Sequence, residues 1–124
     1  MAMGKDLDVY KRAYRLALEI HKFSFTLPKE LQYDLADQIR RASRSIPSNI
    51  VEGLARDKSS KDTLNFLRDA LGSNDEILFN LEFMKDAGFL TEERYKNFSD
   101  EYIVCGKQIF RLMQHINQPL ATSN

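Results

Sequence analysis

Histidine and cysteine, the residue types that most often carry catalysis or bind metals, are rare in this chain of 124 residues. The two histidines, His21 and His115, stand near opposite ends, and Glu19 precedes His21 by two residues, not by the three of a Glu-x-x-His ligand pair. Cys105 falls in phase with the apolar residues of a helical pattern, where a small buried side chain is the ordinary role. The sequence also has no glycine-rich phosphate loop and no nucleophile elbow. We therefore expect no catalytic residues, no metal site, no cofactor and no enzymatic activity.

Charged residues are unevenly distributed, although 18 basic and 18 acidic side chains leave no formal net charge. Residues 40–61 contain six basic and two acidic side chains, whereas residues 69–101 contain three basic and nine acidic ones. A basic cluster can bind the phosphates of RNA or DNA, or it can pair with the acidic helix of a neighbouring subunit. The sequence favours neither interpretation. The candidate nucleic-acid-binding residues are Arg40, Arg41, Arg44, Arg56, Lys58 and Lys61.

Apolar residues recur at intervals of three and four in four segments, which is the pattern of amphipathic helices. With only 5 glycines and 3 prolines, the chain has few residues that end a helix, so the helices should be long. In the first segment we expect the side formed by Tyr10, Tyr14, Ala17, Leu18 and His21 to face the core. The predicted helices span about residues 7–25, 28–56, 60–87 and 92–116.

Short connectors between these helices place consecutive helices side by side in opposite directions. We therefore expect an all-α fold, an antiparallel up-and-down four-helix bundle, formed by a single domain over residues 1–124. Its core should span about residues 7–116, and residues 117–124 should be a frayed tail. Gly88 is predicted to close the third helix in the left-handed conformation, and Thr91 to cap the fourth.

Pro47 lies inside the second predicted helix, where it removes a backbone donor and leaves the carbonyl of Ser43 without its usual partner. Because Ile46 and Ile50 keep the helical phase across the proline, we expect a kinked continuous helix. A break into two helices is the alternative.

The third and fourth predicted helices carry more apolar residues than one core needs, in stripes displaced from one another. Burial between subunits would cover the surplus, so we expect a homo-oligomer; a wide core face is the alternative. Gly72 and Gly106, in the middle of these helices, predict a close approach to a neighbouring helix; a tolerated surface glycine is the alternative. The candidate interface residues are Phe66, Ser73, Ile77, Phe79, Phe83, Ile103 and Phe110.

The expected location is the cytoplasm, without membrane contact. The first residues lack the apolar stretch of a signal peptide, and no segment approaches the ~20 apolar residues of a membrane span. A single cysteine also fits a reducing compartment.

Two segments, QIRRASRSIPSNIVEG at residues 38–53 and FLRDALGSNDE at residues 66–76, carry a family resemblance. The chain resembles the bacterial four-helix-bundle family, also called 23S rRNA-intervening-sequence proteins, from about Tyr10 to Leu112. The resemblance implies antiparallel four-helix bundles that assemble into pentamers. A related branch is the accessory protein of diversity-generating retroelements, in which a basic pentamer is thought to bind nucleic acid and a reverse transcriptase. The implied partners are therefore other copies of this chain, RNA or DNA, and a reverse transcriptase. On this resemblance the expected function is a non-enzymatic, nucleic-acid-associated assembly, and a protein-interaction or scaffold module is the alternative.

Overall fold

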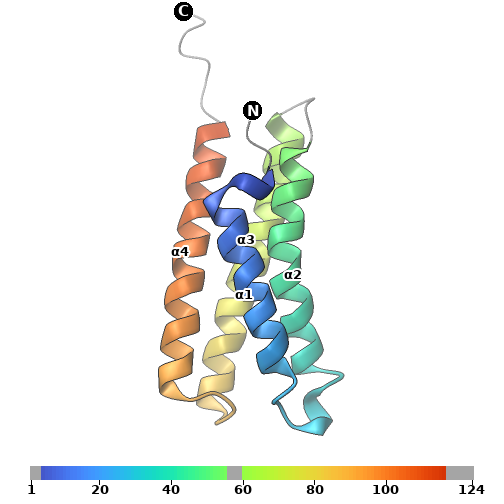
Figure 1. Cartoon of the computed structure of the whole chain (residues 1–124), viewed down its shortest axis with the longest axis vertical. Coiled ribbons are helices and arrows are strands. Elements are labelled where there is room, and N and C mark those ends of the chain that lie inside the picture. Colours follow the sequence, from blue (N-terminus) through green and yellow to red (C-terminus); the bar gives the residue numbers. More distant parts are fainter. Residues whose placement is uncertain (1–3, 56–59, 117–124) are drawn as a thin grey trace, which may run out of the picture.

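The computed structural model describes residues 4–55 and 60–116, and almost all of them are helical (Figure 1). Consecutive helices run in opposite directions, and the backbone of each lies closest to its two neighbours in the order α1, α2, α3, α4 around the bundle. The predicted all-α, antiparallel up-and-down four-helix bundle is confirmed. Its helices are α1 (Asp8–Ser24), α2 (Leu35–Leu54), α3 (Ser60–Asp86) and α4 (Glu92–Ile116), with two short 3-10 turns, η1 (Gly4–Asp6) and η2 (Lys29–Leu31).

One hydrophobic core runs through the bundle, and each of the four helices contributes to it. Ile20 of α1, Ile46 of α2, Leu67 of α3 and Ile109 of α4 are all fully buried. Residues at intervals of three and four share one side of a helix, so each helix presents a continuous apolar stripe to the other three. Burial of these stripes provides most of the free energy that stabilises the fold.

In α1 the predicted inner side was wrong in part. The buried stripe consists of Val9, Ala13, Leu16, Ile20 and Phe23, together with Ala17, whereas Tyr14, Leu18 and His21 are exposed and Tyr10 is half-buried. This helix therefore carries two apolar stripes, and only one of them contacts the core.

The second helix begins later than predicted, at Leu35 rather than near Pro28. Residues 29–31 form the turn η2, and Asp34 has a non-helical backbone with φ −129° and ψ −103°. The side-chain amide of Gln32 donates to the carbonyls of Ser24 and Leu27, at 2.9 and 3.0 Å. These bonds hold the connection in a compact turn that a continuous helix would not allow.

Pro47 does not break α2, which is one helix from Leu35 to Leu54. Ile46 and Ile50 are both fully buried, as predicted. The hydroxyl of Ser43 donates to the carbonyl of Arg40 at 3.1 Å, one turn back along the helix. The bend near Ser43 stays a prediction.

The ends of α3 and α4 agree with the sequence analysis. Gly88 has φ +89°, the left-handed conformation expected after the last turn of α3. The backbone N–H of Arg94 donates to the hydroxyl of Thr91 at 3.1 Å, which is the predicted cap of α4.

The two mid-helix glycines differ from one another. A Cβ atom on Gly106 would lie 2.9 Å from Nδ2 of Asn74, so α3 and α4 approach closely there, as predicted. A Cβ atom on Gly72 would meet no described atom within 4 Å, and the prediction of close packing was wrong at that position.

Candidate functional surfaces

Arg40, a predicted phosphate contact, is half-buried and holds the connection between α1 and α2. Its Nη1 donates to Oγ of Ser24 at 2.7 Å and to Oε1 of Gln32 at 3.2 Å, and its Nη2 donates to the carbonyl of Gln32 at 2.9 Å. Its guanidinium also stacks on Phe25, with Cζ 4.4 Å from the ring centroid. Because these donors already have partners within the chain, the geometry favours a structural role for Arg40.

The other candidate basic residues that the structure describes differ in their partners. Arg41 is exposed and forms an ion pair with Asp37 at 3.0 Å, one turn earlier in α2. Arg44 in α2 and Lys61 in α3 are exposed, and neither has an ion-pair partner within residues 4–55 and 60–116. Arg56 and Lys58 lie outside the described residues.

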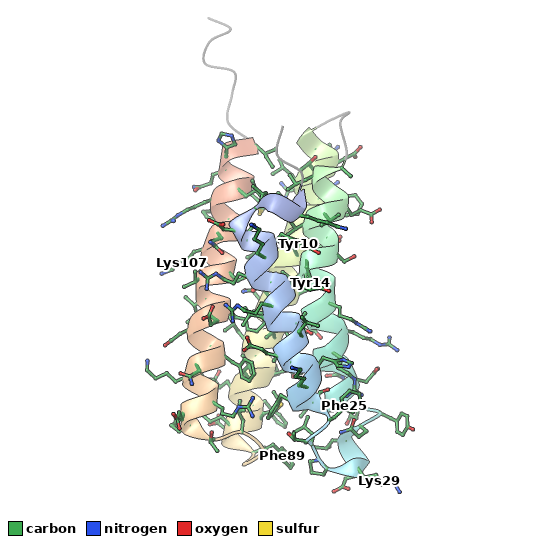
Figure 2. All side chains as sticks on the ribbon, in the orientation of Figure 1. Tyr10, Tyr14, Phe25, Lys29, Phe89 and Lys107 are labelled. Carbon is green, nitrogen blue, oxygen red and sulfur yellow. The ribbon has the colours of Figure 1, made fainter. Side chains whose placement is uncertain are left out.

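A groove of about 520 Å³ runs between α1 and α2. Tyr10 and Tyr14 stack along one wall with ring centroids 5.8 Å apart, and Figure 2 shows them following one another along α1. Leu18 continues this wall one turn later, and Val51 of α2 contributes to the other. Arg44 lies at the groove and is its one α2 cation within the described residues. Lys5 and Glu52 are the other charged residues of its lining. The groove is therefore mainly apolar and aromatic, with more positive than negative charge at its border.

The candidate interface residues divide into two groups. Ile77 is fully buried in the core of one chain, so it cannot line an outer surface. Phe66 and Ser73 are half-buried against α2: a Cβ atom on Gly53 would lie 2.8 Å from Cβ of Phe66, and the hydroxyls of Ser73 and Ser45 are 2.8 Å apart.

Phe79 and Phe83 on α3, and Ile103 and Phe110 on α4, are exposed. Phe79 is the most exposed of them, at 67%. A shallower groove between the two helices contains Ile103 and Phe110 together with Leu71 of α3. We call the four exposed residues the α3–α4 apolar surface.

A charged seam between α1 and α4 was not predicted from the sequence. Glu101 of α4 accepts hydrogen bonds from Arg12 and from Arg15, the latter at 2.9 Å, and Arg15 also pairs with Glu19 at 2.9 Å. Burial alone would raise the pKa of Glu101, but the two guanidinium groups together hold that pKa below its ordinary value. Only the pair of Arg15 and Glu19, one helical turn apart, leaves a signal in the sequence.

The interior contains the polar side chains of Asn74, Tyr102 and Cys105, whose contacts fit a role in packing the helices. Nδ2 of Asn74 donates to the carbonyl of Tyr102 at 2.9 Å, across the gap that Gly106 leaves open. Oδ1 of Asn74 and the hydroxyl of Tyr102 are buried without a hydrogen-bond partner among the described residues. Burial raises the pKa of the Cys105 thiol to about 12, which keeps the thiol protonated and poorly reactive at neutral pH.

The described helices contain neither a metal centre nor a membrane span. No group of three or more histidine, cysteine, aspartate or glutamate side chains is placed to hold a metal ion within residues 4–55 and 60–116. No helix in this part of the chain is long and apolar enough to cross a membrane.

Comparisons with known proteins agree with the resemblance of residues 38–53 and 66–76. The bundle is similar to the crystal structure of a protein of unknown function from the S23 ribosomal protein family of Bacteroides thetaiotaomicron VPI-5482, with a TM-score of 0.79. The two sequences are 24% identical, and the match covers 86% of this chain and 95% of that one, so the likeness shows the fold. No curated protein matches. The family model of the 23S rRNA-intervening sequence protein matches residues 5–111, and this chain therefore belongs to that family.

Proposed function

We propose that this chain is a non-enzymatic helical module that assembles with copies of itself. The observation that supports this proposal is the α3–α4 apolar surface, in which Phe79 and Phe110 are 67% and 52% exposed. Each exposed aromatic side chain leaves apolar area in contact with water, and burial of that area is favourable by about 25 cal/mol per Å². Several such residues on two adjacent helices are typical of a subunit interface. We propose the pentamer implied by the family resemblance as the number of subunits.

Light scattering coupled to size-exclusion chromatography tests this assembly. The wild-type chain should elute with a mass near five times the 14.4 kDa of one chain. The double variant Phe79→Ser with Phe110→Ser should lose the assembly. Tyr33→Ser is the matched control, because Tyr33 is 96% exposed but lies in the connection between α1 and α2. A wild-type monomer at micromolar concentration would overturn the proposal.

Nucleic-acid association is the second candidate function. Arg44 and Lys61 support it, since both are exposed and neither has an ion-pair partner in the described part of the chain. An assembly would repeat these charges in every subunit, and repeated phosphate contacts give binding that weakens steeply with salt. Self-association ranks first because Arg40 and Arg41 already have partners within the chain.

Fluorescence anisotropy with mixed RNA and DNA at ~50 mM salt, where phosphate contacts are strong, measures this second function. Replacing Arg44 and Lys61 by glutamine should lower the affinity and flatten its salt dependence. The control is Arg41→Gln, which removes a cation already paired with Asp37. Absence of binding by the wild-type chain would end this candidate.

A further inference from the structure

We propose that the groove between α1 and α2 of one copy receives the outer side of α3 of the next copy. The inserted residues are Phe79 and Phe83, which we call the α3 ridge. This inference rests on the proposed self-association and identifies the two surfaces that meet in it.

The groove has the shape and chemistry to accept apolar side chains. It measures about 520 Å³, and Tyr10, Tyr14 and Leu18 line its α1 side. Tyr14 and Leu18 are 50% and 51% exposed although they lie in the middle of a helix. The other stripe of α1 is the one buried in the core of the chain. Tyr14 and Leu18 lie outside that core. A partner that fills the groove would remove their apolar area from water.

The α3 ridge has the complementary form. Phe79 and Phe83 are four residues apart, so their rings lie one helical turn from each other on α3. Asp75, Glu76 and Glu82 flank them on the same helix. These three carboxylates are exposed and have no ion-pair partner within residues 4–55 and 60–116. The ridge is therefore apolar and negatively charged.

The charges favour the α3 ridge of another copy as the occupant of the groove over a contact between two ridges. Lys5 and Arg44 line the groove together with one acid, Glu52, so cations outnumber anions there. Arg44 has no ion-pair partner among the described residues. The carboxylates around the α3 ridge supply a partner for Arg44 when the ridge enters the groove. In a contact between two ridges, by contrast, Asp75, Glu76 and Glu82 would face their own copies, and like charges across an interface repel.

The positions of the two surfaces determine the kind of assembly. The backbone of α3 lies close to α2 and α4 but not to α1, so α1 and α3 are diagonal in the bundle, and Figure 1 shows α1 in front of α3. The α1 wall of the groove and the exposed α3 ridge therefore lie on different sides of one chain. A contact between two different surfaces repeats from copy to copy, and it closes into a ring when the rotation allows.

A mixing experiment with two variants tests this pairing. The groove variant carries Tyr14→Asp and Leu18→Asp, and the ridge variant carries Phe79→Asp and Phe83→Asp. All four positions are at least half exposed, so each variant should keep its helical circular dichroism spectrum. Each variant alone should be a monomer by light scattering. Their mixture should form a 1:1 complex of twice the 14.4 kDa chain mass, because exactly one intact contact is then available.

The other outcomes separate the two proposals. A groove variant that assembles like the wild type would overturn the pairing and leave self-association standing. Two monomeric variants whose mixture stays monomeric would also overturn the pairing, whereas a monomeric wild type would overturn both proposals. Tyr33→Asp is the matched control, since Tyr33 is 96% exposed in the connection between α1 and α2, outside both surfaces. This variant should assemble as the wild type does.

Charge reversal provides a second measurement that does not change the apolar residues. Arg44→Glu should weaken the assembly, seen as a shift of the dissociation midpoint to higher protein concentration. Adding Glu76→Lys and Glu82→Lys to the same chain should restore it, as a mutant cycle would show. Failure of the reversed acids to restore assembly would refute the predicted charge contact.

Discussion

Replacing Gly106 by alanine should destabilise the bundle, although the same change at Gly72 should stabilise it. Both glycines lie inside long helices, where alanine is ordinarily favoured over glycine by about 0.5–1 kcal/mol. The two sites differ in what the new methyl group meets. At Gly106 it would lie 2.9 Å from Nδ2 of Asn74, whereas at Gly72 it would meet no described atom within 4 Å.

The expected magnitude follows from the hydrogen bond that Asn74 would lose. Nδ2 of this side chain donates to the carbonyl of Tyr102 at 2.9 Å, and both residues are buried. To make room for a methyl group, the amide must move away from that carbonyl. An unsatisfied buried polar group costs about 1–3 kcal/mol. The gain in helix propensity is common to both variants, so the difference in stability between Gly72→Ala and Gly106→Ala should also be about 1–3 kcal/mol.

Urea unfolding followed by circular dichroism measures this difference. All variants should be compared at one protein concentration, because assembly couples the unfolding midpoint to concentration. In the background Asn74→Ala the obstructing amide is absent, so Gly106→Ala should there become stabilising by about 0.5–1 kcal/mol. If Gly106→Ala were as stable as Gly72→Ala in the wild-type background, the close contact between α3 and α4 would not exist as described.

Three further predictions concern polar groups within the chain. Arg40→Leu should destabilise the fold by about 1–3 kcal/mol in urea unfolding, since it removes three hydrogen bonds from a half-buried site, whereas Arg41→Leu should change stability by less than about 1 kcal/mol. The pKa of Glu101 is lower in the folded state, so the stabilisation from Glu101 is present above its unfolded pKa of about 4.3 and is lost as pH falls through its folded pKa. In Glu101→Gln the free energy of unfolding should therefore fall less steeply at acid pH. Cys105, with a pKa raised to about 12 by burial, should resist a thiol reagent at pH 8 in the folded protein and react once urea unfolds it.

Most of the fold could be predicted from the sequence, because helix ends and apolar stripes are local signals. The fourth helix was predicted at 92–116 and lies there, since Thr91 supplies the cap and a continuous pattern follows it. The predicted start of the second helix was wrong. Pro28 is able to begin a helix, and nothing in the residue pattern shows that Gln32 donates hydrogen bonds to the carbonyls of Ser24 and Leu27. Such contacts form only after the chain has turned.

The candidate sites were harder to predict, because they depend on which of several equivalent side chains faces inward. Tyr14 and Leu18 are as apolar as the true core stripe of α1, so periodicity alone could not rank the two stripes. Arg40 and Arg44 are likewise indistinguishable as sequence positions. The structure separates them, since only Arg40 lies within reach of Ser24, Gln32 and Phe25.

The uneven distribution of charge along the chain becomes informative when the residues that form ion pairs or hydrogen bonds within the chain are set aside. Arg40 is bonded within the turn between α1 and α2, and Arg41 is paired with Asp37. Of the three arginines of α2, only Arg44 is left without an ion-pair partner in the described part of the chain, and it lies at the groove between α1 and α2. The free carboxylates of α3 lie around the α3 ridge, not beside that groove. Opposite charges beside two separate apolar surfaces do not pair within one chain, but they would orient one chain against another in the proposed contact. Zero net charge is therefore compatible with a directional assembly, because direction depends on where the charges lie and not on their sum.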